Sequence, residues 1–368
     1  MKLACWGFYG YDSLGDELLM GNLVERLMRR GIAPGCITLF CREPQIPPDT
    51  VAGIQFCART ATQIMKQACA ADVFIIGPGG LFPVRNSGKL LLFALGGAIL
   101  RLRGKKMIFL GVGISSCNFE STLDLWFVRQ MFRLADDVIL RCQIKGKVPP
   151  WVLQNAPVKE TVDMMFMPQA LPPPLEIAPA TPYIIIALVN DFTAAEAEAR
   201  HTLVVQMCKT IQHILAQGRR VYLMPFSKTK DTLLQREIAA MVHSGDCVSL
   251  DYNTDIPAVT NLFASAHYVL SMRFHAVVLA LRYAVPVYAL SYNDKIDDLM
   301  GRFELEDLLL PYRGGAGRAD AYTISAQTMI AQCDKIETEY AKIKERILQK
   351  LPQIQEMTKI YQDVIEAV

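Results

Sequence analysis

The chain has 368 residues, of which 52% are hydrophobic and 20% are charged, a composition typical of a globular protein. Because a domain takes about 150 residues, this length predicts two domains, each large enough to bury a core without disulfides or metal ions. The formal net charge is only +2 and the positive residues are scattered, so no nucleic-acid partner is predicted. The composition does not exclude a small anionic substrate.

The ten cysteines never form a Cys-x-x-Cys pair, which argues against a zinc site or a thioredoxin-like redox site. Most of them lie in or beside apolar runs, where a free thiol behaves as a small hydrophobic side chain. This usage predicts a reducing, cytoplasmic compartment and no metal site.

The apolar segments of the first hundred residues are too short or too interrupted to be membrane segments. Residues Met1 to Gly10 contain two glycines and no small-residue cleavage site, so they predict a first strand and not a signal peptide. The run Leu90 to Leu100 is well short of the roughly 20 residues that a membrane span needs. A solvated helix end and a peripheral contact with anionic lipid at the inner face of the membrane both stay open, because four cations follow this run: Arg101, Arg103, Lys105 and Lys106.

The first half of the chain alternates short apolar runs with helix-length segments, the pattern of a parallel α/β sheet. An amphipathic stretch from Glu17 to Arg30 predicts the first helix. The predicted strands are Lys2 to Trp6, Cys36 to Phe40, Val73 to Ile76, Met107 to Leu110 and Val138 to Leu140.

Prolines at positions 172–174, 179 and 182 end this half and predict a stiff linker. The second half then restarts the same rhythm, with helices to Gln217 and from Asp231 to His243. Its predicted strands are Tyr183 to Val189, Val221 to Met224, Cys247 to Leu250, His267 to Ser271 and Pro286 to Ser291. The predicted organisation is an N-terminal domain (1–170), a linker (171–182), a C-terminal domain (183–325) and a charged helical tail (326–368).

Two Rossmann-like domains that face a central cleft are therefore the predicted architecture. Neither a short-period repeat nor a low-complexity tract is present, which argues against solenoids and propellers. Ligands of open α/β sheets bind beyond the carboxyl ends of the strands, so chemistry is expected in the loops that follow them.

Two segments of the first domain carry candidate substrate contacts. Asp16 and Glu17 begin the helix after the first strand, where a carboxylate either caps the helix or contacts a substrate hydroxyl. Gly79 and Gly80 form a loop after strand Val73 to Ile76, which either lets a ligand approach the backbone or only makes a tight turn. Arg85, which follows, is a candidate partner for an anion.

In the second domain, Ser227 and Lys228 follow strand Val221 to Met224 close to the start of a helix. A hydroxyl and an ammonium group at a helix start suit a phosphate or a carboxylate. The alternative is a solvated loop in which Asp231 caps the helix.

The segment Ser271 to His275 is the strongest candidate. It follows a strand and precedes an apolar helical stretch, so Arg273 and His275 lie at a helix N-terminus, where the helix dipole opposes positive charge. An anionic ligand would resolve this conflict, and the helix would hold the imidazole of His275 close to its neutral form, ready for proton transfer. A hydrogen-bonded structural histidine is the alternative.

These residues form a pattern that resembles the polysaccharide pyruvyl transferase family over most of residues 3–300. Phe274 stands where the family usually has leucine, Ser13 where it has asparagine, and Pro78 interrupts the glycine run. Arg141 and Cys142 stand where Arg-Asp is common. The matching segments are Gly15 to Glu17, Gly77 to Leu81, Gly111 to Ile114, Arg273 to His275 and Ser291 to Lys295.

The resemblance implies a GT-B-like fold, with phosphoenolpyruvate as donor substrate and no cofactor. The acceptor would be a sugar diol, for example on a lipid-linked oligosaccharide, and the product a cyclic pyruvate ketal in a cell-surface polysaccharide. Arg273 and His275 match the donor contact and acid/base pair, with Ser271, Ser291 and Lys295 as further substrate contacts. The donor is expected in the C-terminal domain and the acceptor in the N-terminal one, and a homo-oligomer stays open.

Two other functions stay open. A sugar-nucleotide-dependent glycosyltransferase on the same fold often carries paired glutamates at a helix start, and no Glu-x₇-Glu pair follows Ser291. A glycan-binding assembly protein would keep the fold without turnover.

Overall fold

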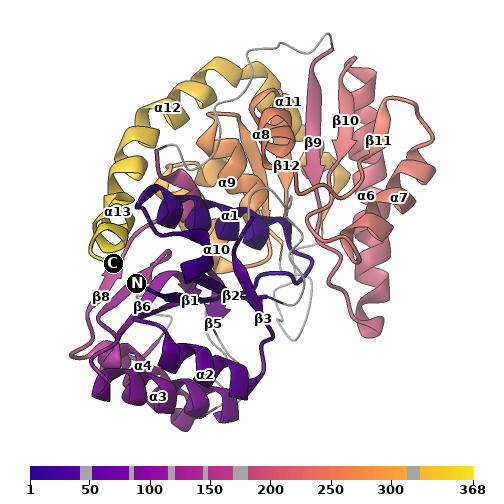
Figure 1. The fold of residues 1–368 in the computed structure, drawn as a ribbon. Coiled ribbons are helices and arrows are strands. Elements are labelled where there is room, and N and C mark those ends of the chain that lie inside the picture. The colour runs from indigo at the N-terminus through magenta and orange to yellow at the C-terminus, as the bar shows by residue number, and fades with distance from the viewer. Residues whose placement is uncertain (42–51, 83–86, 115–120, 144–147, 169–180, 313–323) are drawn as a thin grey trace. The chain divides into compact units, whose positions relative to one another are not determined.

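The computed structural model describes residues 1–41, 52–82, 87–114, 121–143, 148–168, 181–312 and 324–368 (Figure 1). The chain divides into two compact units, here called unit 1 (Met1–Ala170 with Gln355–Val368) and unit 2 (Leu171–Ile354). Each contains one parallel sheet with helices, as the alternating pattern predicts. All but the last two residues of the predicted linker 171–182 lie outside the described residues.

Unit 1 has an eight-stranded sheet in the order β3-β2-β1-β4-β6-β7-β8, with β5 paired to β6. Its strands are β1 (Leu3–Trp6), β2 (Ile37–Phe40), β3 (Gln55–Cys57), β4 (Val73–Ile76), β5 (Gly79–Phe82), β6 (Lys106–Ile114), β7 (Asp137–Leu140) and β8 (Val158–Glu160). Its helices are α1 (Leu14–Arg29), η1 (Pro34–Cys36), α2 (Ala61–Ala70), α3 (Ser87–Leu102), α4 (Thr122–Leu134), α5 (Pro150–Leu153), η3 (Met164–Phe166) and α13 (Lys359–Glu366).

Strands β1, β2 and β4 of this sheet are buried along their whole length, which explains their continuous apolar sequence. Helices α2, α3 and α4 lie together on one side of the sheet, and α1 lies on the other (Figure 1). Phe74 and Phe109 of the sheet share one core cluster with Leu90 of α3 and Phe132 of α4. This packing fixes the carboxyl ends of the strands, from which the candidate residues emerge.

Unit 2 has a six-stranded parallel sheet in the order β11-β10-β9-β12-β13-β14. Its strands are β9 (Tyr183–Ala187), β10 (Arg220–Leu223), β11 (Cys247–Ser249), β12 (Tyr268–Ser271), β13 (Val287–Ser291) and β14 (Leu309–Pro311). Its helices are η4 (Ala194–Glu196), α6 (Ala197–Ala216), α7 (Asp231–Val242), α8 (Ile256–Ala264), α9 (Phe274–Arg282), α10 (Asp294–Arg302), η5 (Glu306–Leu308), α11 (Ala326–Thr338) and most of α12 (Tyr340–Met357).

Every strand predicted from the sequence is present, with ends that differ by a few residues. The sequence analysis missed β3, β5, β8 and β14, each of only three or four residues. Gly79 and Gly80 were expected in a loop, but they begin β5, which pairs with β6. A glycine pair lacks the β-branched side chains that indicate a strand, so only the pairing reveals it.

The helical tail does not behave as one segment. Helix α11 packs against α6 in unit 2, whereas α13 belongs to unit 1. The Tyr361 hydroxyl donates to the carbonyl oxygen of Val162 at 2.7 Å, and Thr161 Oγ1 donates to the carbonyl oxygen of Met357 at 2.5 Å. These contacts fasten the end of the chain to the β8 side of unit 1.

Candidate functional site

The segment from Ser271 to His275 connects a central strand of unit 2 to a helix. Strand β12 lies between β9 and β13, and Arg273 is the N-cap residue of α9. Ser271 is fully buried, and its Oγ accepts a hydrogen bond from the Arg273 N–H at 2.8 Å. The same hydroxyl lies 3.3 Å from the Ala187 carbonyl oxygen, to which it can donate. Ser271 therefore holds the turn that places Arg273 and His275 at the carboxyl edge of the sheet.

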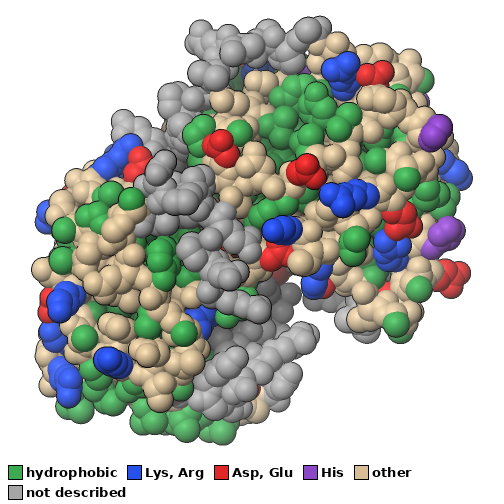
Figure 2. All heavy atoms as spheres, turned by 45° about the vertical axis from the view of Figure 1, so that its right-hand side comes forward, with side chains coloured by type: hydrophobic (Ala, Val, Ile, Leu, Met, Phe, Trp, Pro, Cys, Tyr) green, Lys and Arg blue, Asp and Glu red, His purple; other side chains and the backbone are tan. Residues whose placement is uncertain are grey.

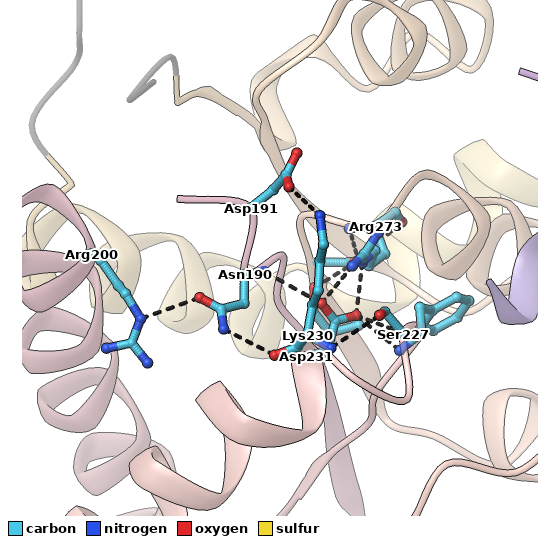
Figure 3. A network of polar contacts seen from close by, with 10 residues as sticks. Asn190, Asp191, Arg200, Ser227, Lys230, Asp231 and Arg273 are labelled. Atoms are coloured by element: carbon cyan, nitrogen blue, oxygen red, sulfur yellow. Dashed lines mark hydrogen bonds and ion pairs between the residues drawn. The ribbon is translucent and has the colours of Figure 1, made fainter. Parts of the chain in front are cut away.

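Arg273 is paired with a carboxylate from another strand end. Its Nε donates to Asp231 Oδ2 at 2.9 Å and its Nη2 donates to Asp231 Oδ1 at 2.5 Å (Figure 3). Asp231 is the first residue of α7 and is fully buried, whereas 23% of the Arg273 side chain is exposed. This two-point geometry fixes the plane of the guanidinium group.

Backbone N–H groups complete the surroundings of the Asp231 carboxylate. Its Oδ2 accepts from Phe226 at 3.1 Å and Ser227 at 2.9 Å, and its Oδ1 accepts from Asn190 at 3.3 Å. Asp231 thus joins the loops after β9, β10 and β12. The sequence suggested only a helix cap for this residue, and the structure gives it the central position of a network.

The network extends outward through Asn190 (Figure 3). The Asn190 amide donates to the Lys230 carbonyl oxygen at 2.9 Å, and Arg200 Nε donates to Asn190 Oδ1 at 3.2 Å. Lys230 Nζ pairs with Asp191 at 2.6 Å, and both side chains are more than half exposed. The inner pair is therefore rigidly held, whereas the outer pair is solvated.

The dipole of α9 opposes the positive charge of Arg273 at its N-terminus, and the carboxylate of Asp231 stabilises this charge. Burial opposes the charged form of Arg273, but the Coulombic attraction and hydrogen bonds of Asp231 outweigh it, so the pKa of Arg273 lies above its usual value. Burial also raises the pKa of Tyr292, at the end of β13, and the nearby Arg273 charge opposes this rise. Arg273 is thus a permanent cation whose charge Asp231 largely balances.

The turn after β13 is built in the same way as the turn after β12. Ser291 is buried, and its Oγ donates to the Asn293 carbonyl oxygen at 2.7 Å. Asn293 caps α10 by accepting from the Lys295 N–H at 3.2 Å. Lys295 therefore lies in the first turn of α10, half-buried, at the same edge of the sheet as Arg273. Ser271 and Ser291 thus stabilise the turns after the two strands, and the positive charges come from Arg273 and Lys295.

The remaining candidates of unit 2 lie close to this edge. Ser227 is buried, and its Oγ accepts from the Lys230 N–H at 3.2 Å, while Lys228 is exposed. His275 is half-buried, and its ring meets the Phe274 ring edge to face with centroids 5.2 Å apart. The segments after β10, β12 and β13 thus place five candidate residues at the carboxyl edge of this sheet: Lys228, Asp231, Arg273, His275 and Lys295.

In unit 1, α1 and β5 bring two predicted candidates together. A side chain at Gly79, where φ is +137°, would place its Cβ 3.1 Å from Asp16 Oδ1. The carboxylate of Asp16, which is half-buried, therefore lies against the backbone of the glycine pair. Gly80 follows at the same edge, whereas Arg85 lies outside the described residues.

Glu17 has a structural role in this arrangement. Its side chain is fully buried, and Oε1 accepts from the Gly10 N–H at 2.6 Å. Tyr9 is also buried and donates to the Gly77 carbonyl oxygen. Together these bonds tie the loop after β1 to α1 and to the end of β4. Asp16 is thereby the more accessible carboxylate of the two.

The sequence analysis missed a cluster of three aromatic rings around Arg59. The Arg59 guanidinium carbon lies 4.7 Å from the Trp6 ring centre, 4.6 Å from that of Tyr11 and 5.3 Å from that of Phe8. Phe8 and Tyr11 are 36% and 43% exposed, and burial lowers the pKa of Arg59. The loops after β1 and β3 thus form an aromatic, cationic rim, which we call the Arg59 cluster. The aromatic residues of the Phe-Tyr-Gly-Tyr sequence at positions 8–11 were the available signal.

Unit 1 also holds an arginine that the sequence analysis did not treat as a site residue. Arg141, at the end of β7, pairs with Asp163 at 2.5 Å, and their side chains are 4% and 0% exposed. A Cβ atom at Gly113 would lie 3.1 Å from Arg141 Nε, so Gly113 packs closely against this side chain. Both sheets therefore carry an Arg–Asp pair with a fully buried carboxylate at their carboxyl ends.

Within the described part of the chain, no group of three or more His, Cys, Asp or Glu side chains is arranged to hold a metal ion. None of the helices described is both long and apolar enough to cross a membrane. The cysteines that the structure describes are all free thiols.

Comparison with known proteins identifies the fold. The chain resembles S. aureus MnaA in its UDP co-structure (TM-score 0.61, 11% identity, 95% of this chain and 91% of that one). It also resembles the UDP-GlcNAc 2-epimerase from Neisseria meningitidis bound to UDP-GlcNAc (TM-score 0.60, 10% identity, 100% of both chains). A third similar structure is the Streptomyces sp. SF2575 glycosyltransferase SsfS6 (TM-score 0.50, 11% identity, 98% of this chain and 99% of that one). At such identities the likeness shows the fold alone, which is GT-B-like as expected.

The sequence comparison identifies the family. No curated protein matches the sequence. The family model described as polysaccharide pyruvyl transferase matches residues 14–294, which include Asp16, the glycine pair of β5 and the Arg273 to His275 turn. This match confirms the resemblance found in the sequence: the chain belongs to the polysaccharide pyruvyl transferase family and is an enzyme of that class.

Proposed function

We propose that this enzyme transfers the enolpyruvyl unit of phosphoenolpyruvate to two hydroxyls of one sugar in a cell-surface polysaccharide precursor. The products are a cyclic pyruvate ketal and inorganic phosphate. The observation that carries the proposal is the β12–α9 turn, where a fixed arginine and a half-buried histidine stand two residues apart at a helix N-terminus. A permanent cation can bind the anionic groups of phosphoenolpyruvate, and a titratable ring beside it can transfer the proton that the enol carbon needs.

The donor anion is assigned to the edge of Arg273 that does not face Asp231. Two of its nitrogens donate to that carboxylate, and 23% of the Arg273 side chain is exposed. Because Asp231 balances most of this charge, Arg273 alone does not neutralise a phosphate and a carboxylate. Lys295 and Lys228, at the ends of β13 and β10, are the additional cations that we assign to the donor, together with the α9 dipole.

His275 is assigned the proton transfers. It protonates the methylene carbon of the enol, which becomes a methyl group and leaves a cation-like centre at the adjacent carbon. One sugar hydroxyl adds there, and its proton returns to the His275 ring. The second hydroxyl displaces the phosphate, which leaves with the bonding electron pair and takes the remaining proton. The overall exchange forms two C–O bonds and breaks the C–O bond to phosphate.

The acceptor sugar is assigned to the carboxyl edge of the unit 1 sheet. Asp16 is the half-buried carboxylate there, and it can accept a hydrogen bond from a sugar hydroxyl. The exposed faces of Phe8 and Tyr11 suit the apolar face of a pyranose ring, and Arg59 suits an acidic substituent. Glu17 and Tyr9 hold the loop that presents these groups.

The titration of phosphoenolpyruvate into the purified enzyme tests the donor assignment without knowledge of the acceptor. Isothermal calorimetry should show binding that weakens at least about tenfold in Arg273→Lys, because an ammonium group cannot reproduce a planar fork held by Asp231. Lys295→Met should weaken it as well and leaves the buried pair intact. Equal affinity of all three proteins would refute the donor site.

Phosphate release separates the proposal from the two alternatives. The enzyme should release phosphate from phosphoenolpyruvate when lipid-linked oligosaccharides are added. A sugar-nucleotide glycosyltransferase, the activity class of one structural neighbour, would instead release UDP from a UDP-sugar and leave phosphoenolpyruvate intact. A glycan-binding protein would release neither product.

A further inference from the structure

Two neighbouring helices of unit 1 expose large apolar side chains. On α3, Leu91, Leu95 and Leu102 are 43%, 53% and 88% exposed, and on α4, Leu123 and Trp126 are 53% and 47% exposed. The two helices pack against each other on the same side of the sheet (Figure 1). We call these five side chains the α3–α4 apolar face.

The exposed leucines of α3 form one stripe. Leu95 is four residues after Leu91, and Leu102 is seven residues after Leu95, spacings that place side chains on the same side of a helix. The core of unit 1 does not need this stripe, because α3 uses Leu90, Ala94 and Leu100 for packing. The helix is therefore apolar both toward the core and toward the solvent.

The exposed charged side chains on these two helices are all positive among the described residues. Among the described residues of α3 and α4, the exposed side chains are apolar, a threonine, or the cations Arg101 and Arg133. Asp124, the carboxylate in the first turn of α4, is only 4% exposed. Arg101 pairs with Asp136 at 3.1 Å, Arg103 is exposed just after α3, and Lys106 Nζ donates to the carbonyl oxygen of Ala367 at 2.9 Å.

Figure 2 shows hydrophobic side chains gathered at the lower end of the molecule, where Figure 1 places α3 and α4, with lysine and arginine side chains above them. A pair of helices whose described residues expose apolar side chains and cations but no carboxylate matches the interface of a bilayer that contains anionic lipid. Trp126 suits this interface, because its ring is apolar and its N–H can reach water or headgroups. A second copy of the same face would instead oppose cations with cations.

We propose that the α3–α4 apolar face docks unit 1 on anionic membranes, with the leucines and Trp126 inserted below the headgroups and Arg103 and Arg133 against them. The inference extends the charge pattern noted after residue 100 and does not depend on the donor or the acceptor. Such docking would hold the enzyme on a surface where lipid-linked substrates lie.

Vesicle co-sedimentation of the full chain tests the docking. Vesicles of phosphatidylcholine with 30% phosphatidylglycerol should bind the protein, and pure phosphatidylcholine should bind it at least about tenfold less. The variant Leu95→Ser/Leu102→Ser/Trp126→Ser should lose at least about tenfold in partitioning. The matched control Leu233→Ser/Leu348→Ser changes two leucines of unit 2 that are 65% and 50% exposed, and it should bind like the wild type.

Trp126 provides a second readout. Vesicles made with brominated lipid should quench the fluorescence of the wild type more strongly than that of Trp126→Phe, which keeps only the buried Trp6 and the partly buried Trp151. Circular dichroism checks that each variant is folded. Wild type that stays in the supernatant, or a triple variant that sediments as well as the control, would overturn the proposal. So would light scattering that shows a dimer abolished by the triple variant, since the face would then be an interface between copies.

Discussion

Arg273 and Asp231 come from the ends of two different strands of unit 2, and they form a two-point ion pair in which the carboxylate is fully buried. This relationship links the donor site to the stability of the unit. The arginine that we assign to phosphoenolpyruvate is also the counterion of the carboxylate that joins three strand-end loops. A change at either residue should therefore affect both folding and binding.

The first prediction is that Asp231→Asn destabilises unit 2. The amide has the same size, but it leaves the Arg273 cation without its counterion and places an NH₂ group where the carboxylate accepted backbone hydrogen bonds. Removal of one partner of a buried pair costs about 3–5 kcal/mol, and the partial exposure of Arg273 places the expected loss near the lower end. Urea denaturation followed by circular dichroism measures it.

Asp246→Asn is the control for this measurement. Asp246 pairs with Arg220 at 3.0 Å in the same unit, but the two side chains are 60% and 49% exposed. An exposed pair contributes at most about 1 kcal/mol, so this variant should unfold nearly as the wild type does. Equal losses in the two variants would show that the burial of Asp231 has no energetic consequence.

The second prediction concerns the chemical step. His275→Ala should lower kcat by roughly 10² to 10⁴ while the thermal unfolding of the protein stays close to that of the wild type. His213→Ala is the control, because His213 pairs with Asp334 on α11 and is not part of the β12–α9 turn. Phosphate release under saturating donor measures both. Near wild-type turnover in His275→Ala would remove this residue from the mechanism.

Much of this site could be predicted from sequence, for a physical reason. Parallel strands buried on both faces appear as continuous apolar runs, and their carboxyl ends mark where ligands bind. The positions of Arg273 and His275 after β12 follow from this pattern alone. Contacts between residues that follow different strands cannot be predicted in this way. Arg273 and Asp231 are 42 residues apart in the sequence, and no local sequence pattern indicates that they pair.

The same limit explains why the Arg59 cluster was missed, whereas the bonds of the two strand-end serines are local. Ser271 and Ser291 were predicted to contact the substrate, and the structure shows both hydroxyls buried and bonded to backbone groups of the following turns. The Arg59 cluster was missed because its arginine lies in a separate loop, about 50 residues after Trp6, and the rings meet it only when β1 and β3 enter one sheet.

The third prediction tests the Arg59 cluster. Tyr11→Ala should raise the KM for the acceptor roughly threefold to tenfold, the effect expected for one lost aromatic contact, and leave the KM for phosphoenolpyruvate unchanged. Phe56→Ala is the control, because Phe56 is 40% exposed on β3 but makes no ring contact with Arg59 in the described structure. A rise in the KM for the donor in Tyr11→Ala would contradict the assignment of this rim to the acceptor.

The last prediction is a pH dependence that arises from an ion-pair network around Asp307. Asp307, in η5, accepts from Arg346 Nη2 at 2.7 Å and from Lys335 Nζ at 2.7 Å, and so connects η5 to α11 and α12. These bonds, led by those of Arg346, lower the pKa of Asp307 from 3.8 to about 2. A carboxyl group whose pKa is lower in the folded state stabilises the fold above its unfolded value and loses that contribution as the pH falls through the folded value.

Asp307→Asn should therefore unfold at a lower urea concentration than the wild type at pH 7 and at pH 5, by the same amount at both. The difference should shrink between about pH 4 and pH 2, where the wild-type carboxyl also becomes neutral. Because 38% of the Asp307 side chain is exposed, water screens the interaction, and the difference at neutral pH should stay within about 1 kcal/mol. A difference that persists unchanged at pH 2 would mean that the amide disturbs packing, because a lost charge has no effect once the wild-type group is protonated.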